Sequence, residues 1–256
     1  MASFVRLGRL DPYELFASTM RESRPVMETM YYGAFTSFTR RNGLLKEALW
    51  RQCDQDYDGV FGELGLGVRL SGRTYDTSHL HAEAQIMDLQ ADQFASLVLC
   101  FGDDVAQRFR RAVLGGGASL YPGYGPTYHG ERLTTLLRVG SNCYRHISEW
   151  DDMFTRLPYP NAAEFAPGSL ERKALQNIEI IQRVFGIGVH ELIRDLVSWR
   201  ILCTIDGQYG TAEPSYDRFE TALISAGRDI AHAAGKDALA RLDTKLCERG
   251  LREAVA

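Results

Sequence analysis

The chain has 256 residues, of which 45% are hydrophobic, 24% are charged and 11% are aromatic. This composition is typical of a folded globular protein, and it excludes intrinsic disorder, collagen-like repeats and a small disulfide-stapled scaffold. The formal net charge of −4 provides no basic field that would attract nucleic acid. We expect a single domain over residues 1–256, with one candidate for an internal crossover linker at 158–169.

Helical signals dominate the first part of the chain. Asp11-Pro12 has the pattern of a helix start, because an acidic cap precedes proline at the first helical position. A second helix is expected from Pro25 to the stop signal at Asn42-Gly43, and a short third helix over 44–53. Five glycines between 54 and 77 then indicate a loop, with a small hairpin near 59–75.

The helical pattern continues to the end of the chain. After the cap Asp76-Thr77-Ser78, apolar residues recur at helical spacing over about five turns. They are Leu80, Ala84, Met87, Ala91, Phe94 and Val98. Further helices are expected over 104–114, 133–154, 178–199 and 219–246. The sequence therefore predicts an all-α helical bundle of about seven to nine helices.

The sequence also bears on the compartment. No window approaches the roughly 20 apolar residues that a membrane-spanning helix needs, and the N-terminus lacks the apolar core of a signal peptide. The five cysteines are scattered without a CxxC pair, which fits free thiols in a reducing environment. We expect a cytoplasmic protein with no nucleic-acid partner and no membrane partner, and a homodimer is left open.

A loop rich in glycine and tyrosine joins two predicted helices between 115 and 130. Long ordered loops in compact domains are usually lids or binding loops, and tyrosine offers both a ring face and a hydroxyl. The pattern favours Tyr121, Tyr124, Tyr128 and His129 as contacts to a small-molecule substrate. A solvated, turn-rich crossover explains the same residues equally well.

The segment from His79 to Glu83 contains candidate catalytic groups. On a helix His79 and Glu83 lie one turn apart, which fits either a general base, His79, oriented by Glu83 or a pair of metal ligands, with His81 as the alternative base. His81-Ala82-Glu83 also matches half of the zinc deaminase signature, in which histidine binds zinc and glutamate transfers protons. The PCxxC half is absent. A capping histidine in a salt link with Glu83 accounts for the same residues.

His190 lies on an apolar sector of its predicted helix. A buried histidine must be hydrogen-bonded, metal-bound or neutral, so His190 is a candidate axial ligand of haem or a ligand of a single iron or zinc ion. Cys143 and His146, one helical turn apart, are further candidate metal ligands or a nucleophilic pair. In each case a core residue with satisfied hydrogen bonds is the alternative.

These residues lead to three functional hypotheses. The first is a haem- or metal-dependent oxygenase or oxidoreductase with a histidine-lined pocket, acting on an aromatic or amino-acid-like substrate. The second is a non-catalytic helical binding or regulatory protein, and the third is a metal-dependent deaminase or hydrolase that uses His81-Ala82-Glu83. The first hypothesis requires imidazoles from separate helices to converge on one chamber beneath the tyrosine-rich loop.

Overall fold

The computed structural model describes residues 12–63, 76–114, 123–154, 164–187, 196–207 and 213–248. These residues contain six helices and one short antiparallel hairpin. The helices are α1 (Pro12–Glu63), α2 (Ser78–Leu114), α3 (Leu133–Phe154), α4 (Leu170–Phe185), α5 (Val197–Asp206) and α6 (Tyr216–Glu248). The hairpin pairs β1 (Thr127–Tyr128) with β2 (Glu131–Arg132). The all-α prediction is confirmed, although this part of the chain has fewer helices than the seven to nine expected.

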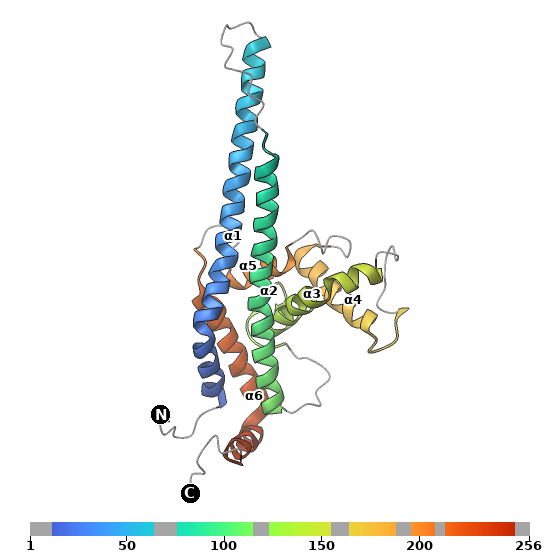
Figure 1. Cartoon of the computed structure of the whole chain (residues 1–256). Coiled ribbons are helices and arrows are strands. Elements are labelled where there is room, and N and C mark those ends of the chain that lie inside the picture. Colours follow the sequence, from blue (N-terminus) through green and yellow to red (C-terminus); the bar gives the residue numbers. More distant parts are fainter. Residues whose placement is uncertain are drawn as a thin grey trace.

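The two longest helices, α1 and α2, lie side by side and run in opposite directions (Figure 1). A Cβ placed on Gly33 of α1 would lie 3.2 Å from the ring of Phe94 of α2, and Arg40 pairs with Glu83 further along. We call the α1 residues after Phe38 and the α2 residues before Asp92 the arm, because α5 contacts the pair at those two positions. The arm projects beyond the remaining helices. No helix among the described residues is long and apolar enough to span a membrane.

The other helices pack around the base of this pair. Gly140 of α3 marks the tightest crossing, because a Cβ there would lie 2.5 Å from Leu99 Cδ1 of α2 and 3.1 Å from Ile201 Cδ1 of α5. Glycine at this position therefore allows α2, α3 and α5 to meet. α4 lies against α3, where Asn142 Nδ2 donates to Asn177 Oδ1 at 3.3 Å.

The helix starts differ in where their caps come from. The backbone N–H of Ser78 donates to Asp76 Oδ1 at 2.9 Å, which confirms the predicted cap of α2. The N-cap residue of α5, Leu196, makes no side-chain capping bond. A side chain of another helix provides the cap instead, because the backbone N–H of Trp199 donates to Asp92 Oδ1 of α2 at 3.0 Å. A carboxylate there also complements the positive end of the α5 dipole.

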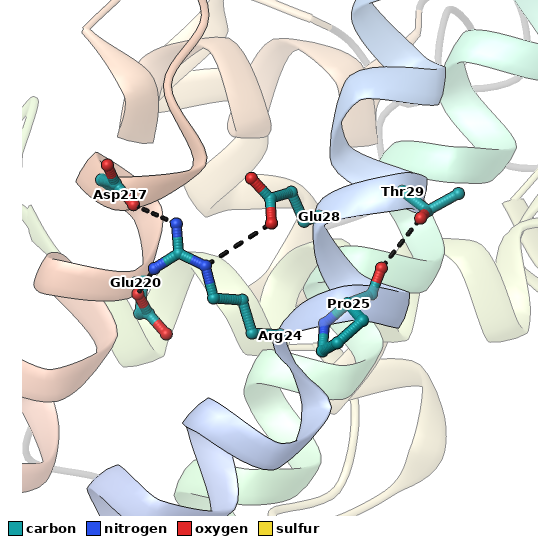
Figure 2. Close-up of polar contacts among 6 residues, drawn as sticks. All are labelled: Arg24, Pro25, Glu28, Thr29, Asp217 and Glu220. Atoms are coloured by element: carbon teal, nitrogen blue, oxygen red, sulfur yellow. Dashed lines mark hydrogen bonds and ion pairs between the residues drawn. The ribbon is translucent and has the colours of Figure 1, made fainter.

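The predicted helix boundaries at Pro25 and Gly43 are wrong, because α1 continues through both. Pro25 removes one backbone donor, and Thr29 Oγ1 donates to the Pro25 carbonyl at 2.8 Å (Figure 2). Gly43 costs a helix interior about 1 kcal/mol relative to alanine. Packing of α1 against α2, with Arg40 and Arg41 paired to Glu83 and Asp88 directly before Gly43, outweighs this local preference.

Arg24, beside this proline, ties α1 to the start of α6 (Figure 2). Its Nη1 donates to Glu220 Oε2 at 2.7 Å, its Nη2 donates to Asp217, and its Nε lies 3.5 Å from Glu28 Oε2. The guanidinium carbon lies 5.4 Å from the ring centre of Tyr216. Only 10% of the Glu220 side chain is exposed, so Arg24 supplies the countercharge of a largely buried carboxylate.

Three further predictions about elements need correction. The hairpin expected near 59–75 is wrong over 59–63, where the chain is helical, and the rest of it lies outside the described residues. The helices expected before and after residue 102 are one helix, α2. The helix expected over 178–199 ends at Gly186, a left-handed C-cap with φ 70°. Of the predicted linker 158–169, the described part, 164–169, contains no α-helix and leads into the Ser169 cap of α4.

Candidate functional site

The histidines proposed for catalysis lie at the beginning of α2, on the arm. His79 and His81 are both exposed there. Glu83 forms an ion pair with Arg40 of α1, so its carboxylate serves to join the two helices of the arm. The expected His79–Glu83 pair is not formed in this described segment, and an exposed imidazole keeps contact with water instead of lining a pocket.

Cys143 and His146 face different surroundings on α3. Cys143 is buried, and the pKa of its thiol is raised to about 12. Desolvation is the larger cause, and the nearby Asp92 carboxylate is the smaller one. A catalytic thiol needs a lowered pKa, so this environment opposes nucleophilic chemistry. His146 Nδ1 lies 2.9 Å from Glu149 Oε2 on the same helix, which gives this half-buried histidine a surface partner.

The described part of the tyrosine-rich loop carries the β1–β2 hairpin. Its turn is made by His129 and Gly130, with φ values of 48° and 84°, a combination that favours tight hairpins. His129 is exposed, whereas Tyr124 is buried and Tyr128 is half-buried. Burial and the charge of Asp206 raise the pKa of Tyr128. Tyr121 lies outside the described residues.

Hydrogen bonds fix this loop to the body of the protein. The backbone N–H of Gly125 donates to Asp229 Oδ2 of α6 at 2.9 Å, and Arg132 Nη1 donates to the Gly125 carbonyl at 2.8 Å. The Tyr124 N–H donates to Thr134 Oγ1 at 2.8 Å. A Cβ on Gly125 would lie 2.8 Å from Ala226 Cβ, so the backbone lies directly on α6. The loop therefore covers the core, and Tyr124 packs inward.

Among the described residues, the candidate ligands do not come together. In the parts of the chain with described side chains, no group of three or more His, Cys, Asp or Glu residues could hold a metal ion. His190, the candidate haem or metal ligand, lies outside the described residues. The hypothesis of a haem- or metal-dependent enzyme thus stays a prediction that depends on His190 and on Tyr121.

Sequence reasoning missed a buried polar cluster at the end of α5. Asp206 is 1% exposed, and its Oδ1 accepts hydrogen bonds from the Tyr31 hydroxyl and, at 3.2 Å, from the Ser215 N–H. Arg218 Nη1 lies 3.3 Å from Asp206 Oδ2 and donates to the Asp206 carbonyl at 2.9 Å. Burial nevertheless raises the pKa of Asp206, because desolvation outweighs these stabilising contacts. The fully buried Tyr31 places this cluster in the core, where it joins α1, α5 and α6.

Asp92 of α2 is a second buried carboxylate that the sequence alone does not reveal, since a helical projection puts it on the polar face with His81. It is largely buried, and desolvation raises the pKa of its carboxyl group to about 6, against the hydrogen bonds donated by the Trp199 and Ser198 N–H groups. Ser198 is held in turn by Ser96, whose hydroxyl lies 2.8 Å from the Ser198 hydroxyl. These residues fix α5 to α2 and are structural.

The most unusual surface belongs to the outer side of α2. We call its exposed residues from 82 to 97 the α2 face; they are Ala82, Gln85, Ile86, Leu89, Gln90, Gln93 and Leu97. Three large apolar side chains stand out on it, with Ile86 53% exposed, Leu89 62% exposed and Leu97 39% exposed. None of the seven carries a charge.

The neutrality of the α2 face follows from how α2 uses its charged residues. Between Ser78 and Leu97 the sequence has three charged residues, all acidic. Glu83 pairs with Arg40, Asp88 Oδ1 lies 3.0 Å from Arg41 Nε, and Asp92 caps α5. Every carboxylate is thus engaged by α1 or α5, and the outer side is left with apolar and amide side chains.

Family models, curated proteins and solved structures were compared with the chain, and none matches. The chemistry of the described residues is therefore the basis for a functional proposal.

Proposed function

We propose that this protein is a non-catalytic helical binding protein and that its α2 face docks a helix of a protein partner. The observation that carries the proposal is the exposure of Ile86, Leu89 and Leu97 on a helical face without charge. Depletion of charged residues distinguishes the core of protein interfaces from ordinary surface. A contiguous exposed apolar patch rimmed by polar groups is the usual mark of an interaction site.

The spacing of the face favours a helical partner. Ala82, Ile86, Leu89 and Gln93 follow one another at steps of four, three and four residues. This alternation is the pattern with which one helix packs its side chains between those of another. At a rise of 1.5 Å per residue, the face from Ala82 to Leu97 is about 24 Å long.

The arm supports the same function. Because the arm projects beyond the other helices, a partner can lie along α2 without meeting them over most of the face (Figure 1). Leu49 and Trp50 of α1 are 60% and 62% exposed, which gives the arm further apolar surface.

The test uses full-length protein with a charge placed on the face. Ile86→Glu and Leu89→Glu each replace an exposed apolar side chain by a carboxylate, and Thr36→Glu, at an exposed position of α1, is the matched control. Tagged proteins are used to capture partners from source cells, and each captured protein is then produced separately and titrated. We expect a partner that binds the wild type and Thr36→Glu equally, and both face variants at least tenfold more weakly, because burying one such side chain contributes about 1.5–3 kcal/mol. Equal binding of all four proteins would refute the proposal.

A further inference from the structure

We propose that the partner helix is α2 of a second copy of this chain, packed antiparallel so that Ile86 of one copy lies opposite Leu89 of the other. This inference depends on the proposed function, since it names the occupant of the same face. The face runs along α2 from Ala82 to Leu97, the segment in which all three carboxylates are engaged within the chain.

The absence of charge on the α2 face favours a second copy as the partner. In a two-fold symmetric dimer the same patch meets itself, so a charged patch of one sign would repel its counterpart. The α2 face has no charge and is compatible with itself. A strongly charged partner surface would lose its hydration there without gaining a countercharge.

The order of side chains along the α2 face also matches that of a second, antiparallel copy. With Ile86 opposite Leu89, the two-fold axis passes between residues 87 and 88 and gathers both pairs of large apolar side chains at the centre. Ala82 then lies opposite Gln93, and Ser78 lies opposite Leu97, so that small side chains meet long ones. The result is an apolar centre with an amide rim, the usual anatomy of an interface.

The position of α3 selects the antiparallel arrangement. α3 reaches α2 at Cys100, whose Sγ lies 4.0 Å from the Ser141 carbonyl oxygen. In a parallel pair the two copies of α3 would meet at the same level, directly after the face. In the antiparallel register Leu97 lies opposite Ser78, the first residue of the partner's α2, so the two copies of α3 lie at opposite ends of the paired segment.

The length of the face sets the expected strength. Stable interfaces bury roughly 1,200–2,000 Å² in total, and a contact along one pair of helices about 24 Å long and about 10 Å wide is smaller than that, in the size class of weak, transient interfaces. We therefore expect a reversible dimer with a dissociation constant in the micromolar range.

Sedimentation equilibrium of the full-length chain, from one micromolar to a few hundred micromolar, tests the association. We expect a monomer–dimer equilibrium for the wild type and for Thr36→Glu, and a dissociation constant at least tenfold higher for Ile86→Glu and for Leu89→Glu. Circular dichroism establishes that each variant is folded, and the two face variants serve as independent checks. A dimer that survives both substitutions overturns the inference.

Cysteine cross-linking tests the register. A mixture of Ile86→Cys and Leu89→Cys proteins is oxidised with copper–phenanthroline, with the wild type as the background for its own thiols. Random pairing in an equal mixture already gives twice as much mixed disulfide as either homodisulfide. Antiparallel pairing predicts a mixed fraction well above this two-to-one ratio, and a parallel pair, which overturns the inference, gives a fraction well below it. A wild type that stays monomeric also overturns it. The proposed function is judged separately, because a different protein that the face variants fail to bind would still support it.

Discussion

The hydroxyl of Tyr31 provides the sharpest test of the buried cluster around Asp206. Tyr31→Phe removes this hydroxyl and leaves the ring, so contacts such as that with Phe35, at 4.9 Å between ring centres, are kept. The hydroxyl donates to a carboxylate that is 1% exposed, and hydrogen bonds to charged groups contribute about 1.5–3 kcal/mol. Because Ser215 and Arg218 still contact Asp206, we expect a loss of about 2 kcal/mol in the free energy of unfolding.

Urea unfolding followed by far-ultraviolet circular dichroism measures this loss. For a chain of this length, about 2 kcal/mol corresponds to a decrease of about 4–8 °C in the melting temperature. Tyr32→Phe is the matched control, because this neighbouring side chain is 39% exposed, and the control should stay within about 0.5 kcal/mol of the wild type.

A double-mutant cycle measures the interaction between Tyr31 and Asp206 directly. Tyr31→Phe and Asp206→Asn, alone and combined, should give a coupling energy of about 1–2 kcal/mol, since the two side chains are in direct contact. A Tyr31→Phe protein as stable as the wild type, or a coupling energy near zero, would show that this hydrogen bond does not hold α1 to α5.

Three further experiments, on two glycines, on Arg24 and on Asp92, test other contacts of the fold. Gly140→Ala should destabilise by about 1–3 kcal/mol because its Cβ would overlap a buried leucine, whereas Gly43→Ala, with nothing within 4 Å, should stabilise α1 by up to about 1 kcal/mol in urea unfolding. Arg24→Met should lower the melting temperature more than Glu28→Gln, because only the first leaves the buried carboxylate on α6 without its countercharge. Asp92 has a folded pKa of about 6, above its ordinary 3.8, so stability is lost as the pH rises through this interval. The cost of Asp92→Asn should therefore be about 1 kcal/mol smaller at pH 8 than at pH 5, and a cost independent of pH would contradict this.

The sequence predicted correctly those features that depend on residues close together in the chain. The apolar stripe of α2 is confirmed, because Leu80, Ala84, Met87, Ala91 and Val98 are all buried. The cap at Asp76 is confirmed as well, since a side chain two residues from its partner leaves a readable pattern. Spacing and capping chemistry act within a few residues, which is why the sequence shows them directly.

Sequence reasoning failed where distant residues decide the outcome. The stop predicted at Gly43 is locally sound, but α2 packs along α1 and keeps the helix continuous. Tyr31 and Asp206 are 175 residues apart, and Asp92 lies 107 residues from Trp199, so no window of sequence contains either pair. Helical projection placed Asp92 among exposed residues because the projection contains no α5.

The burial of Asp92 and the apolar outer side of α2 both follow from the direction in which α2 turns its carboxylates. An amphipathic surface helix normally turns its charged residues to water. The segment from Ser78 to Leu97 buries an apolar stripe, but its three carboxylates contact α1 or α5 and leave the outer side without charge. One consequence is a raised pKa for Asp92, the sign of a carboxylate that is costly to bury in its charged form. As an isolated surface, α2 would be more favourable with Asp92 outside and Leu89 inside. A helix whose carboxylates pair with α1 and α5 and whose outer side carries Leu89 is better matched to an outer side that a second helix covers, as the proposed antiparallel dimer requires.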